Sequence, residues 1–333
     1  MPVVYPQALS FMGVAKETTQ GTAVAPARFI PYAPGSLETD EQPEVLIDEG
    51  ERGSMSREYG AVRGKAKVEI GWNGVPFSES IGDLLYNILG GYAVSGAGPF
   101  THTFSVLNSG QGQPPSWTVT DRQGLTPTVG ARAYPGLCLS ELTLSGNAEQ
   151  LLTYECKGTA WPSAAAADAP TNTVPTSTVT PAWRSSVSWA GTAVTSVMEW
   201  TLSISRELMI VNTADGSQNP WTIARGPVSV GGSLNIVASD SSPLSAEVPL
   251  TALTAGTEAA LVIAVASNYA GTAGHSVTFT MTKSQIVKSP LQRGQTVLGW
   301  NIETKSFANA TDVGASGGLA PVKCVLVNGV TTY

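Results

Sequence analysis

The chain has 333 residues, including 35 glycines and 22 prolines, and only 13% of its residues are charged. Its polar residues are mainly Ser, Thr, Asn and Gly. This composition excludes a helical bundle, because helices place Glu, Lys and Arg on their solvent-exposed faces. A net charge of −7 excludes a protein that binds nucleic acid by neutralising phosphates.

The ends and the cysteines of the sequence indicate a protein made and folded in a cytoplasm. The first eleven residues, MPVVYPQALSF, carry no Lys or Arg ahead of an apolar stretch and do not form a secretory signal. The apolar run from Leu261 to Ala266 is far too short to span a membrane. Three cysteines, Cys138, Cys156 and Cys324, are too sparse for a disulfide framework. We expect no membrane partner.

Alternating apolar and polar residues, separated by Gly, Pro or Asn, predict an all-β protein. The clearest strands are expected at residues 62–72, 137–145, 151–159, 197–206, 228–237, 276–287 and 296–307. One segment has helical periodicity instead, with apolar residues at 81, 84, 85, 88 and 89, Ser78 as a candidate N-cap and Gly90 as the end. We expect a short helix over residues 79–89 with one buried face.

Residues 163–185 divide the chain in two. They contain small residues, Thr and Pro with almost no charge, and have too little apolar bulk for a core, which predicts a linker or surface arm. We expect a β-sandwich or barrel module with a flanking helix at residues 1–162 and a second module of similar element order at 186–333. A single elaborated β-sandwich is the alternative.

The repeat is predicted from the order of elements. On each side a strand, at 28–37 or 197–206, leads through a polar loop to an Arg-Gly pair, a further strand and a helical segment, at 79–89 or 243–253. Strands at 101–106, 116–121 and 137–145 are then matched by strands at 261–266, 276–283 and 296–304. The two Arg-Gly pairs are Arg63-Gly64 and Arg225-Gly226.

The sequence contains no recognisable catalytic or metal-binding motif. The two histidines, His102 and His275, each fall in or at the start of an expected strand, where a packed or solvated side chain is the usual role. A hairpin turning at residues 146–148 would place Cys138 opposite Cys156, and we expect two buried thiols there rather than a bond. We therefore expect no enzymatic activity, no metal and no cofactor.

One segment, residues 38–58, concentrates the charge of the chain. It carries −6 of the total −7 and is expected to be a long loop or a hairpin extension. A solvated loop is the simplest interpretation. The alternative is a surface that presents negative charge to a cation, to a basic neighbour or to a polyanion that must be repelled. The charged residues of this candidate contact loop are Glu38, Asp40, Glu41, Glu44, Asp48, Glu49, Glu51, Arg52, Arg57 and Glu58.

Four segments together resemble the major tail tube proteins of long, non-contractile-tailed (siphovirus-type) bacteriophages. They are GVAKETTQGTAVAPARFIPY (13–32), IDEGERGSMSREYGAVRGKAKVEIGW (47–72), LTLSGNAEQLLTYECKGTAWP (142–162) and SISRELMIVNTADGSQNPWTIARG (203–226). The opening K-E-T-x-x-G-T-A-V-A-P is unusual for a β-rich protein, whereas the strand and loop pieces are less specific. The family has no catalytic residues to transfer.

The resemblance implies a structural virion protein. Its inner sheets would close into a ring, the rings would stack helically into a tube, and the lumen would conduct DNA without binding it specifically. Partners would be the protein itself, the tail terminator, the distal tail protein and the tape measure protein, with assembly in the host cytoplasm. The acidic loop would face either the lumen or the next ring. Because a ring of single modules contains six, a duplicated chain predicts trimeric, pseudo-sixfold rings, with hexameric rings as the alternative.

Two other classes of function are weighed against this one. A carbohydrate-binding or adhesive β-module would use the eight tryptophans as stacking platforms, but these are scattered along the chain. A secreted hydrolase is disfavoured because neither an acid–base constellation nor a signal peptide is found.

Overall fold

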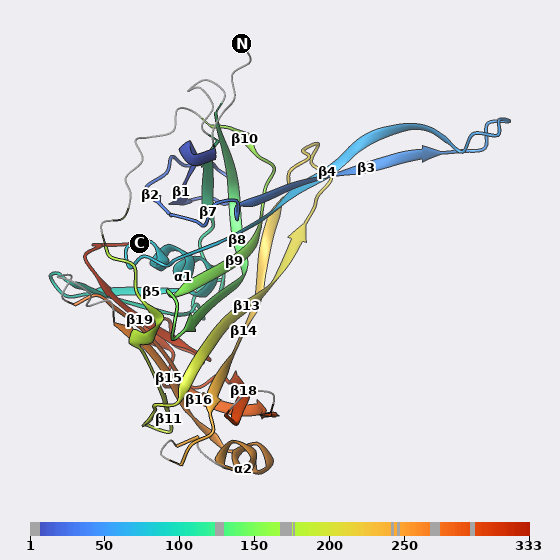
Figure 1. The fold of residues 1–333 in the computed structure, drawn as a ribbon. Helices are drawn as coiled ribbons and strands as arrows, with labels where there is room; N and C mark the ends of the chain where they lie inside the picture. The colour runs from blue at the N-terminus through green and yellow to red at the C-terminus, as the bar shows by residue number, and fades with distance from the viewer. Residues whose placement is uncertain are drawn as a thin grey trace.

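The computed structural model describes residues 7–123, 130–166, 175, 177–240, 243–244, 247–266, 274–293 and 297–333. Within these ranges the chain is mostly β-strand, and every pairing between strands is antiparallel, which confirms the all-β prediction (Figure 1). The strands of the first half are β1 (Phe11–Lys16), β2 (Arg28–Phe29), β3 (Glu38–Glu49), β4 (Glu58–Gly74), β5 (Gly90–Ser95), β6 (Phe100–Val106), β7 (Trp117–Arg122), β8 (Ala131–Asn147), β9 (Thr153–Ala160) and β10 (Ala164–Ala165).

The second half is also mostly β-strand. Its strands are β11 (Ser185–Trp189), β12 (Thr192–Val194), β13 (Val197–Val211), β14 (Thr222–Val237), β15 (Glu258–Ala266), β16 (Ser276–Lys288), β17 (Leu291–Gln292), β18 (Gly299–Ser306) and β19 (Lys323–Asn328). The helices are α1 (Ile81–Leu89) and α2 (Val248–Ala255), with short 3₁₀ turns η1 (Gln7–Leu9), η2 (Ala182–Arg184) and η3 (Gly314–Ser316).

A central sheet runs through both halves of the molecule. Its strand order is β3-β4-β9-β8-β13-β14-β18-β16, so that β8 of the first half pairs directly with β13 of the second. The N-terminal part of β8 leaves this sheet and pairs with β7, which in turn pairs with β1. The N-terminal part of β16 likewise pairs with β15, which pairs with β11. Two long strands therefore connect the central sheet to outer layers.

The core lies on one face of the central sheet. Alternate side chains point into it, among them Trp72, Leu144, Leu202, Leu234 and Ile302, all of which are buried. A single hydrophobic cluster continues from the first half into the second. Because alternate residues of a strand point to opposite faces, the other face of the same strands is left to polar side chains.

Helix α1 covers the core as predicted, with Ile81, Leu85 and Ile88 buried and Gly90 ending it in the left-handed conformation at φ 85°. The predicted N-cap was wrong. The helix begins after Ser80, which makes no capping hydrogen bond, and the Ser78 hydroxyl lies 2.8 Å from Nδ1 of His275 instead. The second helical segment, expected at 243–253, is α2, which begins at Val248.

Of the two forms expected for residues 38–58, the structure has the hairpin extension, because β3 and β4 pair along most of them and only residues 50–57 lie between the two strands. One further expectation needs correction. The strand expected at 28–37 is reduced to β2, since the chain continues into β3 instead. The 163–185 segment contains β10 and η2, while residues 167–174 and 176 lie outside the described residues.

Cys138 and Cys156 do not face each other. A bulge between Leu139 and Glu141 shifts the β8–β9 register, so that Cys138 pairs with Thr159 and Cys156 pairs with Leu142. Both thiols are buried and free, as is Cys324. Burial raises the pKa of Cys156 well above its ordinary value, which keeps this thiol protonated.

Candidate assembly surface

The face of the central sheet opposite the core carries polar side chains and glycine across all eight strands, with Val237 at the end of β14 as an apolar exception. Partners across the strands confirm that these side chains share one face: for example, Lys157 of β9 is opposite Glu141 of β8, which is opposite Ser205 of β13. None of them is buried. We call this set the polar face; it comprises Glu38, Asp40, Gln42, Lys67, Glu69, Asn73, Glu141, Thr143, Ser145, Glu155, Lys157, Glu199, Thr201, Ser203, Ser205, Ser229, Ser233, Asn235, Gln285, Lys288, Asn301, Glu303 and Lys305.

The polar face has more acids than bases. Seven carboxylates and four lysines share it, and three of the lysines are held by neighbouring acids at 2.5 to 2.8 Å: Lys67 by Glu69, Lys157 by Glu155 and Lys288 by Glu303. The Glu155 carboxylate raises the pKa of Lys157 through a hydrogen bond and its charge. Hydroxyls and amides fill most other positions. The face is therefore hydrophilic, weakly acidic and poor in free positive charge.

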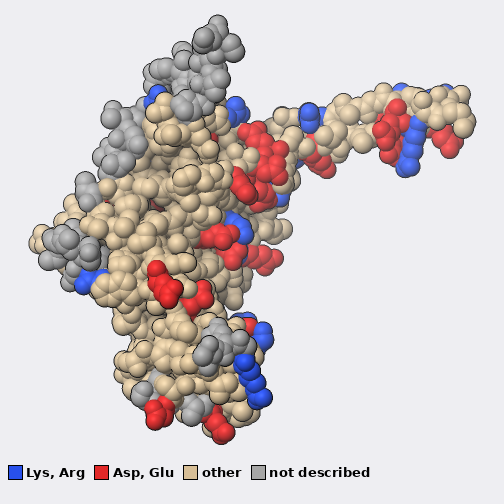
Figure 2. Space-filling view, viewed as in Figure 1, with Lys and Arg blue, Asp and Glu red and all other residues tan. Residues whose placement is uncertain are grey.

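Beyond the polar face, the β3–β4 hairpin continues away from the body (Figure 1). We call residues 44–63 the arm. Charged side chains stand out from the arm in Figure 2. Two exposed ion pairs lie on the arm, Arg52 with Asp48 and Arg57 with Glu49. The arm also exposes large apolar side chains, namely Val45, Leu46, Ile47, Met55 and Val62, and Met55 is fully exposed. Such a surface is both charged and apolar, and the described part of the chain leaves these apolar side chains exposed.

The ten charged residues predicted as one contact loop are thus divided. Glu38 and Asp40 lie on the polar face, and Glu41 lies on the core side of β3, where its carboxylate accepts hydrogen bonds from Arg132, at 3.4 Å, and Ser163. The remaining seven, Glu44, Asp48, Glu49, Glu51, Arg52, Arg57 and Glu58, lie on the arm. Sequence reasoning missed the hydroxyl-rich part of the polar face, although the alternation of Ser and Thr in 201–205 was a signal for it.

The junction between the halves, β8–β13, pairs residues 141–147 with 199–205 in unbroken register. Two buried guanidiniums reinforce it. Arg225 donates to the carbonyls of Asn87 (3.3 Å) and Pro115 (2.9 Å) and to the Cys138 sulfur (3.0 Å), and Arg206 donates to the carbonyl of Ile88 (3.0 Å). Asn87 and Ile88 lie at the C-terminal end of α1, where backbone carbonyls that lack a partner within the helix favour positive charge. Burial and the neighbouring Arg225 lower the pKa of Arg206 to about 10.

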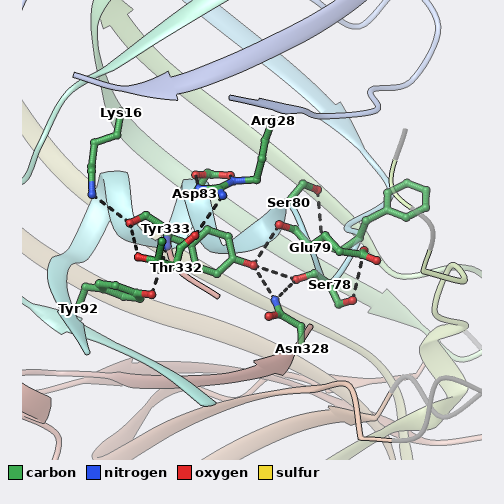
Figure 3. A network of polar contacts seen from close by, with 11 residues as sticks. Lys16, Arg28, Ser78, Glu79, Ser80, Asp83, Tyr92, Asn328, Thr332 and Tyr333 are labelled. Carbon is green, nitrogen blue, oxygen red and sulfur yellow. Dashed lines mark hydrogen bonds and ion pairs between the residues drawn. The ribbon is translucent and has the colours of Figure 1, made fainter. Parts of the chain in front are cut away.

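A second network fastens the end of the chain to the first half (Figure 3). Arg28 holds the buried Asp83 of α1 through two hydrogen bonds of 2.6 and 2.8 Å and also donates to the Thr332 carbonyl. The Tyr333 hydroxyl donates to the backbone of residues 78 and 79, and Lys16 donates to the Tyr333 carbonyl at 3.0 Å. The Tyr333 ring occupies the space that a Cβ at Gly82 would need. The two halves therefore fold as one body.

The tryptophans are mostly structural. Five are buried, at positions 72, 117, 189, 200 and 300, and Trp161 is partly buried. Trp183 and Trp221 are exposed, and they belong to different parts of the fold, Trp183 to η2 and Trp221 to the turn before β14. The described residues thus provide no cluster of tryptophans that would favour the adhesive-module alternative.

Two further observations concern chemistry and membranes. Among the described residues, His, Cys, Asp and Glu side chains do not gather in groups of three or more that could hold a metal ion. Neither α1 nor α2, nor any other helix in the described ranges, has the length and hydropathy needed to cross a membrane.

Comparison with known families identifies the class to which this fold and surface belong. The model of a family described as phage tail tube protein matches residues 7–318, and the chain belongs to that family. It is accordingly a structural protein of the bacteriophage tail tube. No curated protein matches the sequence.

Proposed function

We propose that this protein assembles into rings that stack into the tail tube, and that the polar faces of its central sheets line the lumen through which DNA passes. The observation that carries the proposal is the central sheet itself: it has eight strands from both halves, with one face buried and the other polar apart from Val237. A sheet closed into a barrel has no exposed edges, so a ring of such sheets suits a protein with few surface charges.

The composition of the polar face fits contact with passing DNA. Its surplus of carboxylates repels phosphates, and its lysines are largely neutralised by neighbouring acids, so that DNA is kept in the channel without adhering to it. The carboxylates of Glu38 and Asp40 would add to this lining at the edge of the sheet.

We further propose that the chain contains two copies of one module and that three chains form a ring. In the first half, β3-β4-β9-β8 form the sheet and β8 continues to β7 and β1; in the second, β13-β14-β18-β16 form it and β16 continues to β15 and β11. A helix follows β4 and β14 in each case. Hexameric rings, in which each chain supplies one sheet, are the alternative.

The arm is proposed as the contact between successive rings. It extends beyond the body and exposes apolar side chains that the described residues do not cover. Hydrogen exchange tests this role: amides of residues 44–63 should exchange more slowly in tubes than in subunits. Equal protection in both states would contradict it.

The remaining partners follow from the resemblance of the sequence to tail tube proteins of long, non-contractile tails. We propose that tail terminator and distal tail proteins close the two ends of the tube, that the tape measure protein occupies it before DNA, and that assembly takes place in the host cytoplasm.

Electron microscopy of the purified protein tests the main proposal. We expect rings or tubes, and end-on averages should show three chains around the axis, each contributing two similar sectors. Six chains with one sector each would overturn the three-chain arrangement, and a protein that stays monomeric at all concentrations and in virion extracts would overturn the tube itself.

A further inference from the structure

The two halves share the irregularities of their strands as well as their order. The β3–β4 register shifts between Pro43 and Val45, and the β13–β14 register shifts between Arg206 and Leu208, which is 163 positions later in both cases. The β8–β9 register shifts between Leu139 and Glu141, and the β16–β18 register shifts between Ile286 and Lys288, 147 positions later. Independent folds would have no reason to place both bulges at matching positions.

The first of these bulges has the same side-chain arrangement in both halves. A Cβ added at Gly64 would lie 2.9 Å from Oε2 of Glu44, and a Cβ added at Gly226 would lie 3.2 Å from Cβ of Glu207. Each glycine of the Arg-Gly pairs thus leaves room for the bulged glutamate on the partner strand. The bulges therefore fix which residue of one half corresponds to which residue of the other.

This correspondence exposes an asymmetry at the ends of the central sheet. Strand β8 is paired on both sides, by β9 and by β13. Its counterpart β16 is paired by β18, but pairing with β15 ends at Gln285, and in the described part of the chain no strand continues that edge along residues 288–292. Strand β3, the counterpart of β13, pairs only with β4 among the described strands.

We propose that β3 of one copy of the chain pairs with the β16–β17 edge of the next copy in the register that β8 and β13 use within the chain. This inference rests on the proposed ring. The register follows from subtracting 163 from each β13 residue and adding 147 to each β8 residue. The pair Ser205–Glu141 then gives Gln42 opposite Lys288, and Leu202–Leu144 gives Thr39 opposite Leu291. The pair Thr201–Ser145 gives Glu38 opposite Gln292.

The backbone on both edges has the orientation that this register needs. The carbonyl of Pro290 accepts a hydrogen bond from the Asn301 N–H of β18, so Pro290 faces β18 and its missing N–H is not on the open edge. Because backbone groups alternate along a strand, the N–H and C=O of Leu291 point away from β18, toward the open edge. On the other edge, Ala66, which is opposite Pro43, donates to Gln218 and not to β3, so the polar groups of Pro43 and Thr39 also point outward. Thr39 and Leu291 therefore form a hydrogen-bonded pair, whereas a slip of one residue would not.

Packing and charge are complementary in the same register. Leu37 and Leu291 are partly buried apolar residues at the two edges of the core, and a neighbouring strand would cover both. The β3 segment carries Glu38, Asp40 and Glu41, while the receiving edge carries Lys288 and Arg293. Lys288, already paired with Glu303 at 2.6 Å, would then lie beside acids of both chains.

Cysteine cross-linking tests the register. The pair Glu38 and Gln292 is chosen because it is a non-hydrogen-bonded pair, in which the two Cα atoms are closest, about 4.5 Å apart. In assembled Glu38→Cys/Gln292→Cys protein, oxidation should link neighbouring chains, ending at a covalent trimer in a three-chain ring. The native cysteines are buried and do not compete.

Two matched variants complete the experiment. Ser145→Cys/Thr201→Cys places the same pair at the β8–β13 junction and should cross-link within one chain without raising its mass. Glu38→Cys/Lys288→Cys uses the same face and strands four residues out of register and should not cross-link. If the first variant does not assemble, Gln42→Cys/Lys288→Cys probes the same register.

The outcomes separate this inference from the proposed function. Rings seen by microscopy without cross-linking of either in-register pair, or with cross-linking of the out-of-register pair, overturn the register but leave the tube intact. A protein that forms no rings overturns the proposed function, and the register with it.

Discussion

The hairpins β3–β4 and β13–β14 share one bulge and have opposite surroundings. Both are long, both contain the Glu-and-Gly bulge, and both extend beyond the central sheet. The β13 edge is paired with β8, and Trp200, Leu202 and Ile204 are buried. The equivalent residues are Leu37, just before β3, and Thr39 and Glu41 of β3, none of which is buried. The β13 edge is paired when the chain folds, whereas in the proposed ring the β3 edge pairs with a neighbouring chain. The β3 edge is therefore exposed in the subunit, which explains why its sequence is acidic and polar.

The largest contrast is expected from proline at equivalent edge positions. Leu202→Pro removes a buried side chain and a central ladder hydrogen bond, and should cost about 3 kcal/mol or more of the free energy of unfolding. Thr39→Pro should change that free energy by about 1 kcal/mol or less, because the edge is free in the subunit, yet it should prevent ring formation. Urea denaturation and electron microscopy measure the two effects. Normal rings from Thr39→Pro would contradict the interpretation of β3 as an assembly edge.

The arginines of the two Arg-Gly pairs give the next contrast. Arg225→Met leaves the carbonyls of Asn87 and Pro115 buried without their donor, and should lower the free energy of unfolding by about 2 kcal/mol or more. Arg63 is exposed at the equivalent position, and Arg63→Met should change the free energy of unfolding by about 0.5 kcal/mol or less. Equal losses in chemical denaturation would show that Arg225 does not carry the junction.

A third contrast uses the β5–β6 pair, which has no counterpart in the second half. His102 of β6 is buried, with Nδ1 3.0 Å from the Tyr92 hydroxyl and Nε2 2.8 Å from the Val330 carbonyl. Burial lowers the pKa of His102, so the unfolded chain binds the proton more readily than the folded chain does. Stability should therefore fall as the pH drops below about 6.5, by up to about 1.4 kcal/mol per pH unit.

The control for this effect is His102→Gln, which keeps a hydrogen-bonding side chain but does not titrate. The difference between the wild-type and variant free energies of unfolding should depend on pH below about 6.5 and become constant above it. His275 is present in both proteins and cancels. A difference that does not vary with pH would show that His102 titrates alike in the folded and unfolded chains.

The smallest effect is expected on the arm. Arg57→Gln removes an ion pair whose arginine side chain is 81% exposed, and should change the free energy of unfolding by about 0.5 kcal/mol or less. The same holds for the pair of Arg52 with Asp48, also exposed. A larger loss in either variant would mean that the arm packs on the body of its own subunit.

The sequence was sufficient for features set by local pattern. Period-two alternation located β4, β8, β9, β13, β14, β16 and β18, and the helical spacing of Ile81, Leu85 and Ile88 with Gly90 located α1. The Arg-Gly pairs at 63 and 225, noticed only as a spacing, fall at the same bulge of two hairpins.

Features set by register and tertiary contact were missed. The acidic residues of 38–58 did not distinguish a loop from a hairpin extension, because a hairpin that leaves the body shows no apolar alternation. The bulge after Leu139 cannot be read from composition, and it separated Cys138 from Cys156. In the proposed duplication, the strand pairing gives a different correspondence between the halves, β7 with β15, β8 with β16 and β9 with β18, and β5–β6 then falls outside the match.

The β8–β13 junction has a consequence for the kinetics of assembly. Two strands on one chain meet at an effective concentration in the millimolar range or above, whatever the amount of protein in the cell. The proposed ring has six junctions between neighbouring sheets. Three of them are β8–β13 junctions, which form while each chain folds, and only the three junctions between chains require two molecules to meet. Nucleating the first ring then depends on a lower power of the protein concentration than it would for six separate modules. The junction inside the chain and the junction between chains have different sequences, so their stabilities can differ. The first is kept by the covalent chain, and the second can be tuned by substitutions at the two edges.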